Sequence, residues 1–184
     1  IINSSMATID ALRRQPDTFD YAQSSQFLVT LGNFPLAQYF CTTLTLPGVG
    51  VGRFDRSTSL ANLPMVGDLM TFDDFTMSFM VDENLSNYQE IFNWMVNIGA
   101  PSDHSQFNKR ARADGLDMPG DRNLYSEIQI SILSNKNNPI VRTTLHDSFP
   151  LNLSGLTYTT QETDAVYLTA DVTFTYSYYE FLAL

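Results

Sequence analysis

The sequence predicts a mainly β fold, with two packed antiparallel sheets in a sandwich or barrel-like arrangement and one flanking α-helix. Two observations support this prediction. Several long stretches place apolar residues on every second position, which is the period of a strand with one buried face. Residues 166–178 show this most clearly, because their apolar side chains alternate with threonine, serine and aspartate. Residues 85–98 instead have the spacing of three and four that is typical of an amphipathic helix.

Length and composition indicate one domain over residues 1–184. Hydrophobic residues make up 43% of the chain. A chain of this length can bury roughly 70% of its unfolded surface. Cys41 is the only cysteine, which excludes an internal disulfide and a metal cluster built from cysteines. No apolar run reaches the length of about 20 residues that a membrane-spanning helix needs, so we expect no membrane insertion.

The charge balance is strongly acidic, with 20 aspartates and glutamates against 10 lysines and arginines and a formal net charge of -10. Such a surface repels phosphates and gains nothing from the release of their counterions. We therefore expect no specific binding of nucleic acid, although DNA could pass along the protein without being held.

The N-terminal part is expected to contain a polar arm, two strands and a hairpin. The arm covers residues 1–25. The strands cover residues 26–31 and 36–46, with a glycine- and proline-containing turn between them. Residues 47–67, which begin with a Pro-Gly sequence and contain a second turn at Pro64, are predicted to form a long hairpin that stands away from the body.

A bulge or a sharp bend is expected at Asp73 and Asp74. Before this pair the apolar positions are Met70 and Phe72, whereas after it they fall on every second residue over 75–81. The parity slips by one position, and such a slip sends side chains to the opposite face of a sheet.

The helix predicted over residues 85–98 has signals at both ends. Ser86 and Gln89 can form a capping box, and Gly99 and Pro101 end the apolar pattern. Its apolar stripe is expected to cover one face of a sheet, and consists of Tyr88, Ile91, Phe92 and Met95.

Residues 100–123 are expected to form a loop in which basic residues are concentrated, since it contains four of the ten lysines and arginines. In so acidic a chain, we expect the cluster of Lys109, Arg110 and Arg112 to form salt bridges with a neighbouring acidic subunit. Strands are then predicted over residues 124–132, 140–146 and 166–178.

No set of residues predicts catalysis, a metal site or a cofactor. The acidic pairs at 73–74 and 82–83 lack the spacing of a calcium loop. The two histidines, His104 and His146, have no nucleophile motif to accompany them. We therefore expect a protein that is not an enzyme. An all-β ligand-binding or hydrolytic domain remains the alternative from a different class, and it would need a closed pocket with convergent polar groups.

At the bend, strand and helix, the sequence resembles a known family, the tail tube proteins of contractile-tailed, T4-like bacteriophages. The resemblance covers roughly residues 26–100 and, more loosely, the final strands. The segments that carry it are Thr71–Phe79, Val81–Glu83 and Tyr88–Trp94, together with Leu46–Gly48 and Leu63–Asp68 at the hairpin.

The resemblance implies a subunit that forms rings of six, which stack into a tube with a negatively charged bore for DNA. The hairpin would reach the adjoining ring through Arg53, Phe54, Asp55, Arg56 and Leu60. Asp171, on the polar face of the final strand, would be a candidate for the bore. The implied partners are the tail sheath, baseplate and tail terminator proteins, with the tape measure protein and DNA inside the tube. The implied location is the virion tail, assembled in the host cytoplasm.

Two alternatives within this class stay open, a baseplate tube initiator and the tube protein of a related contractile injection system such as a type VI secretion apparatus. The length of the N-terminal arm and the 100–123 loop depart from the family pattern, and these parts could bind sheath or belong to a baseplate or terminator role.

Overall fold

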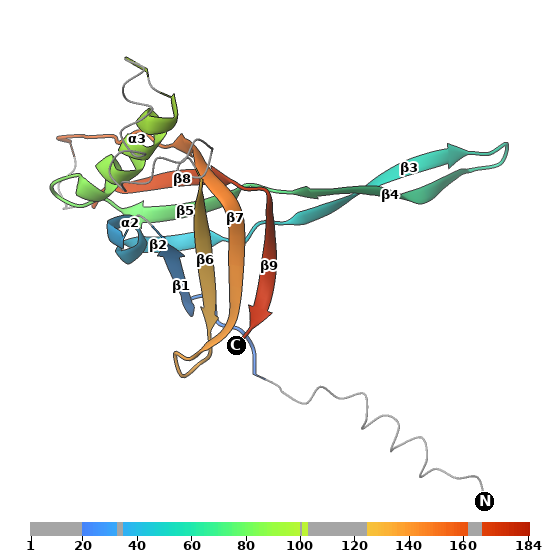
Figure 1. Cartoon of the computed structure of the whole chain (residues 1–184), viewed down its shortest axis with the longest axis horizontal. Coiled ribbons are helices and arrows are strands. Elements are labelled where there is room, and N and C mark those ends of the chain that lie inside the picture. Colours follow the sequence, from blue (N-terminus) through green and yellow to red (C-terminus); the bar gives the residue numbers. More distant parts are fainter. Residues whose placement is uncertain (1–19, 33–34, 100, 103–124, 162–166) are drawn as a thin grey trace, which may run out of the picture.

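The computed structural model describes residues 20–32, 35–99, 101–102, 125–161 and 167–184. Within them, seven strands form one antiparallel sheet and two further strands form a hairpin that projects from the body (Figure 1). The mainly β prediction with one longer helix is confirmed. None of the helices among these residues could span a bilayer. The elements are β1 (Phe27–Leu31), α2 (Pro35–Tyr39), β2 (Cys41–Thr45), β3 (Val49–Ser57), β4 (Asn62–Phe72), β5 (Phe75–Met80), α3 (Ser86–Gly99), β6 (Ser126–Leu133), β7 (Pro139–Leu153), β8 (Thr169–Thr175) and β9 (Tyr178–Ala183).

The long strand β7 belongs to both layers of the fold. Its residues 139–146 pair with β6 and β9, and its residues 149–153 pair with β8. One layer therefore has the order β1-β6-β7-β9 and the other the order β7-β8-β5-β2, and the two groups of strands run crosswise in Figure 1. Asp147 lies at the bend with a φ of 54°, and this left-handed conformation helps the strand to turn from one layer into the other.

The same corner divides the final alternating stretch, which the sequence predicted as one strand over residues 166–178. β8 ends at Thr175 and β9 begins at Tyr178. Both pair with β7, and the register is kept across the corner, since Thr175 lies opposite Phe149 and Tyr178 lies opposite His146. The prediction of a single strand is wrong because β7 bends, and the chain that pairs with it has to bend at the same place.

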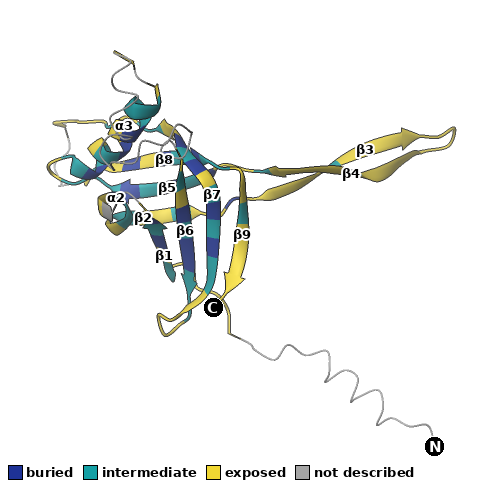
Figure 2. Cartoon of the chain, in the orientation of Figure 1, coloured by how far each residue is buried: buried dark blue, intermediate teal, exposed yellow. Residues whose placement is uncertain are grey.

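The core lies between the two layers, where Figure 2 shows the buried residues concentrated. Phe75, Met77 and Phe79 alternate with outward residues along β5, as the sequence predicted. The ring of Phe174 stacks on Phe75 at 6.1 Å and lies 5.9 Å from the ring of Trp94 on α3. Burial of each such side chain stabilises the fold by about 1.5–3 kcal/mol. The other large buried side chains are Ile91, Ile128, Ile130, Leu145 and Val172.

At Asp73 and Asp74, where the sequence predicted a bulge or a sharp bend, the strand is interrupted, because β4 ends at Phe72 and β5 begins at Phe75. The two strands belong to different parts of the molecule. β4 continues the projecting hairpin, whereas β5 enters the body of the protein (Figure 1).

A buried asparagine joins the end of β5 to the start of α3. Asn87 donates its amide N–H to the carbonyl oxygen of Met80 at 2.7 Å, and its Oδ1 accepts the backbone N–H of Asp82 at 3.2 Å. These bonds satisfy a fully buried polar side chain and hold the turn between strand and helix in one conformation.

The packed face of α3 differs from the predicted stripe. Ile91 is buried, and Tyr88 and Met95 are partly buried, but Phe92 is 51% exposed. Trp94 takes the core position instead, with only 2% of its surface exposed. The helix is anchored through its first-turn asparagine, so the line that faces the core passes through positions 87, 91 and 94.

The strand expected over residues 36–46 also differs, because its first half is the helical turn α2. The backbone N–H of Phe40 donates to the carbonyl oxygen of Leu36, and Gln38 Oε1 accepts the N–H of Leu31 at the end of β1. Over so few residues an apolar pattern does not distinguish a strand from a helical turn. The local hydrogen bonds favour the turn here.

Candidate assembly site

The hairpin of β3 and β4 has no core of its own. In the part of the chain that the structure describes, its two strands pair only with each other, and almost every residue in it is exposed (Figure 2). It runs from residue 49 to residue 72, and therefore extends beyond the predicted 47–67 into the strand that leads to the bend. Nine large apolar side chains are exposed along it: Val49, Val51, Phe54, Leu60, Leu63, Met65, Val66, Leu69 and Met70.

A register shift divides the hairpin into a base half and a tip half. The shift falls between Val51 and Arg53, where Gly52 approaches Gly67. A Cβ on Gly67 would lie 2.7 Å from the carbonyl oxygen of Gly52, so only glycine allows the two backbones this contact. The two halves are thus two short ribbons joined at a close crossing of backbone.

The tip half is amphipathic. Opposed residues of an antiparallel pair share one face, and Phe54 lies opposite Met65 while Arg56 lies opposite Leu63. We call these four residues the tip face. The opposite side of the ribbon carries the pairs Arg53 with Val66, Asp55 with Pro64, and Ser57 with Asn62.

The structure places all five predicted hairpin residues on the exposed ribbon, but not on one side of it. Phe54 and Arg56 belong to the tip face, and Leu60 lies in the turn with 96% of its surface exposed. The other two predicted residues, Arg53 and Asp55, lie on the opposite side. Leu63 and Met65 were missed, although their alternation in the sequence and their position across the turn could have identified them.

The base of the hairpin is clamped to the body by aromatic side chains. The ring of Phe72 lies 6.1 Å from that of Tyr176 and 5.5 Å from that of Tyr179. The Tyr176 hydroxyl donates to the carbonyl oxygen of Asp73 at 2.8 Å, and the Tyr179 hydroxyl donates to that of Pro47 at 3.3 Å. These contacts fix the direction in which the hairpin leaves the body.

Burial raises the pKa of Tyr176 to about 12, and nearby Tyr179, Asp73 and Asp74 add to this shift because a second negative charge would be repelled. The phenol therefore stays protonated near neutral pH and remains a donor to the backbone at the base of the hairpin.

Three strands have an unpaired side within the described residues. β1 pairs only with β6, β2 only with β5, and β9 only with β7. The outer strand β9 also exposes Phe181 and Leu182. Open edges with exposed apolar side chains are places where another chain can add to a sheet.

The outer face of β5 and β8 is polar and rich in hydroxyl groups. Asp171 is exposed on it, and the hydroxyl of Ser78 donates to Asp171 Oδ1 at 2.5 Å. Thr76 and Thr173 lie opposite each other on the same face. This face presents a fixed carboxylate among small neutral side chains.

The remaining sites considered in the sequence are the cationic loop, metal binding and Cys41. The cationic residues Lys109, Arg110 and Arg112 lie outside the described residues. Among the described residues, no group of three or more His, Cys, Asp or Glu side chains could hold a metal ion. Burial raises the pKa of the Cys41 thiol, which disfavours the reactive thiolate.

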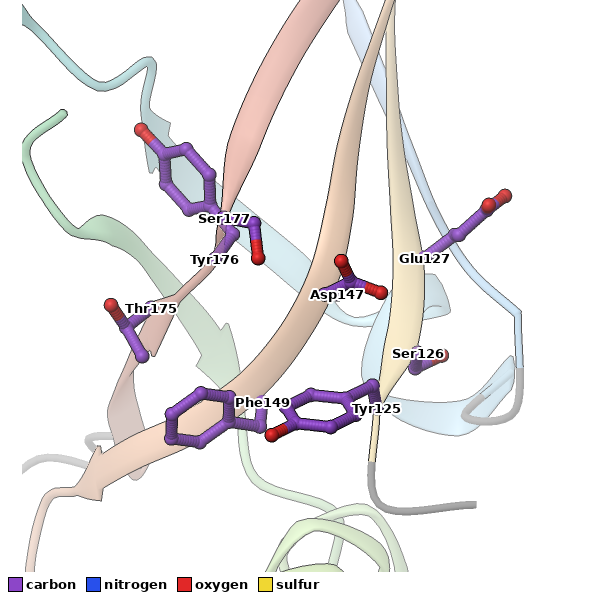
Figure 3. Close-up of a pocket in the computed structure, with 8 residues that line it drawn as sticks. All are labelled: Tyr125, Ser126, Glu127, Asp147, Phe149, Thr175, Tyr176 and Ser177. Carbon is purple, nitrogen blue, oxygen red and sulfur yellow. The ribbon is translucent and has the colours of Figure 1, made fainter. Parts of the chain in front are cut away.

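A pocket of about 790 Å³ lies where β7 turns its corner (Figure 3). It is open to solvent. We call it the corner pocket. It is lined by Tyr125, Ser126, Glu127, Asp147, Phe149, Thr175, Tyr176 and Ser177. It does not have the closed form that a ligand-binding or hydrolytic domain would need.

The sequence from residue 17 to residue 182 matches the model of a family described as phage tail tube protein. The chain belongs to this family. It is a structural tail tube subunit of a phage or of a related contractile injection system, and the family is not enzymatic. The resemblance found in the sequence is confirmed. No curated protein matches the sequence.

Solved structures share the fold of this tail tube protein at low sequence identity. The sheath/tube terminator of an extracellular contractile injection system, PVC, in its extended state is 12% identical with a TM-score of 0.59, over 90% of this chain and 100% of that chain. The tube-terminating cap of the anti-feeding prophage is 12% identical with a TM-score of 0.56, over 94% of this chain and 97% of that one. A chain of the anti-feeding prophage baseplate is 13% identical with a TM-score of 0.52, over 90% and 98% respectively.

Proposed function

We propose that this tail tube protein forms rings of six copies that stack into a tube, and that the tube conducts DNA during ejection. The observation that carries the proposal is the projecting hairpin. It exposes nine large apolar side chains, and no other element among the described residues covers them. A two-stranded ribbon is marginally stable on its own in water, so a neighbouring copy is the natural cover for it.

The open edges of the body support closure into a ring. β1 and β9 are the outer strands of one layer, and β2 is an outer strand of the other. Contacts between different edges of identical copies are heterologous, and they close into a ring when the rotation between copies allows it. Such closure would cover edges that would otherwise promote aggregation.

Charge supports passage of DNA without binding. Six copies with a formal charge of -10 give a ring of about -60, which repels phosphates. We propose that the polar face with Asp171 lines the bore. Its hydroxyl groups offer no cation that would retain DNA, and its carboxylate is held in place by Ser78.

We further propose that the tube works with sheath, terminator and baseplate proteins in the virion tail, with tape measure protein and DNA inside it, after assembly in the host cytoplasm. The structures that share this fold come from assemblies whose names include a sheath, a terminator and a baseplate. Lys109, Arg110 and Arg112 are proposed to form salt bridges between subunits, because the chain as a whole is acidic.

Electron microscopy of the purified full-length chain tests the proposal. We expect rings with sixfold symmetry, and tubes as the concentration rises. The double variant Phe54→Ala/Leu63→Ala should form fewer tubes, whereas Asn93→Ala, an exposed substitution on α3, should assemble normally. A chain that stays monomeric at high concentration would contradict the proposal, and single rings that never elongate would favour an initiator or terminator over the main tube.

A further inference from the structure

The tip face of the hairpin combines apolar surface with one positive charge. Phe54 and Leu63 are 55% and 52% exposed, and Met65 is exposed beside them. Arg56 forms no ion pair in the part of the chain that the structure describes. A surface that covers this face therefore has to supply apolar contact and a carboxylate together.

The corner pocket has both of these properties. The rings of Tyr125 and Phe149 meet edge to face at 5.7 Å and form an aromatic wall. Asp147 extends from the bend of β7 beside them (Figure 3). The pocket has two carboxylates. Glu127 already lies close to a histidine, with 3.5 Å between its Oε1 and Nδ1 of His146. Asp147 is exposed and has no ion-pair partner among the described residues, so it is the carboxylate that can pair with an incoming cation.

The hairpin cannot reach the corner pocket of its own chain. The nine residues of β3 extend it by roughly 30 Å at about 3.3 Å per residue. The aromatic clamp at its base directs it away from the body (Figure 1). Tyr176 lines the pocket and also holds the base of the hairpin, so the pocket lies at the opposite end of the hairpin from the tip face. Only the hairpin of another copy can bring a tip face to this pocket.

We propose that the tip face of one copy docks in the corner pocket of a second copy, with Arg56 paired to Asp147 and the turn at Leu60 against the aromatic wall. This inference rests on the proposed function and identifies the receptor for the hairpin. Each copy donates one hairpin and accepts another, so the contact is heterologous and repeats along an assembly.

Charge reversal tests the pair directly. Arg56→Glu alone and Asp147→Lys alone should each raise the protein concentration needed for tube formation by about tenfold or more, because each places like charges in contact. An equal mixture of the two variants should assemble nearly as well as the unmodified chain. In the mixture, the reversed hairpin of the first variant pairs with the reversed pocket of the second. The native hairpin of the second variant pairs with the native pocket of the first.

Two matched controls accompany the reversal. Arg53→Glu changes the same residue type on the same strand but on the opposite side of the ribbon, and it should assemble with less than about a threefold change. Asp147→Asn removes the charge and keeps a residue that tolerates the left-handed backbone, so it separates loss of the ion pair from a folding defect. The thermal unfolding midpoint of each variant is measured in the dispersed state.

A cross-link provides a second measurement that does not depend on charge. In a Cys41→Ser background, the double variant Ala61→Cys/Ser126→Cys should form disulfide-linked oligomers after assembly. Ala61 lies beside Leu60 in the turn and Ser126 lines the corner pocket, and the variant keeps both the aromatic wall and the Arg56–Asp147 pair. The same protein should remain uncrosslinked when dispersed, because the two positions of one chain lie far apart.

The outcomes separate this inference from the proposed function. Tubes that form normally from Arg56→Glu, or a mixture that fails to recover assembly, overturn the docking and leave the tube itself intact. Loss of assembly in Asp147→Lys but not in Arg56→Glu would show that the pocket receives another segment or another protein, and also overturns the docking. Unmodified protein that forms neither rings nor tubes overturns both proposals.

Discussion

β4 and β5 are consecutive strands with similar apolar content and opposite environments. β5 alternates buried and partly buried residues along Phe75–Met80, and it lies between β2 and β8 in the body. β4 contains two leucines, two methionines, a valine and a phenylalanine, yet most of its residues are exposed. Only Asp73 and Asp74 separate them. Apolar content therefore does not decide burial, since a second layer has to be present to receive the side chains.

The comparison also separates two roles for the same residue type. Apolar side chains on β5 stabilise the single chain, whereas those on β4 can contribute fully only when another surface covers them. Substitutions in the two strands should therefore affect different measurements.

The largest expected effect comes from truncating a core ring. Phe79→Ala removes a fully buried side chain from β5 and should lower the free energy of unfolding by about 3–5 kcal/mol. Phe54→Ala on the hairpin should lower it by less than about 1 kcal/mol. Urea denaturation of dispersed protein measures both. Equal losses for the two variants would break the comparison.

A smaller loss is expected at the joint between β5 and α3. Asn87→Ala leaves the carbonyl oxygen of Met80 without its donor in a buried position and should cost about 1–3 kcal/mol. Asn93→Ala, at an exposed position of the same helix, serves as the control. If the two alanine variants unfold at the same urea concentration, the asparagine does not hold the joint.

The corner of β7 should be sensitive to backbone conformation. Asp147→Val places a β-branched residue at a φ of 54° and should cost about 1–2 kcal/mol, whereas Asp147→Gly should be tolerated in the dispersed chain. Thermal unfolding of the two variants measures the difference. Glycine and valine with the same midpoint would show that the corner does not require this conformation.

The smallest effect is a pH dependence at the junction of body and hairpin. The pKa of Tyr176 is raised to about 12, so the protonated phenol is favoured in the folded state. The stability that it contributes is present below its ordinary pKa of 10 and is lost as pH rises through 12. The stability advantage of the unmodified chain over Tyr176→Phe should therefore shrink between about pH 10 and about pH 12. A constant difference across this range would show that the hydroxyl does not titrate in this way.

Much of the fold follows from short-range pattern. The parity slip at Asp73 and Asp74 predicted an irregularity where β4 ends and β5 begins, and the spacing of apolar residues predicted α3 within a residue at each end. The choice of Phe92 over Trp94 for the packed face was wrong, because neighbouring positions on a helix differ little in pattern and the anchor at Asn87 sets the rotation. The tip face was found only in part, since it consists of two segments that meet across a turn.

The β character, the helix over residues 86–99, the irregularity at Asp73 and Asp74 and the acidic charge follow from the amino-acid sequence, because each of these depends on neighbours in the chain or on composition alone. Long-range pairing, in contrast, sets where β7 bends, why the last alternating stretch becomes β8 and β9, and which residues line the corner pocket. These features depend on which strands pair over long separations. Alternation specifies that a strand has two different faces, but it does not specify the partner that covers them.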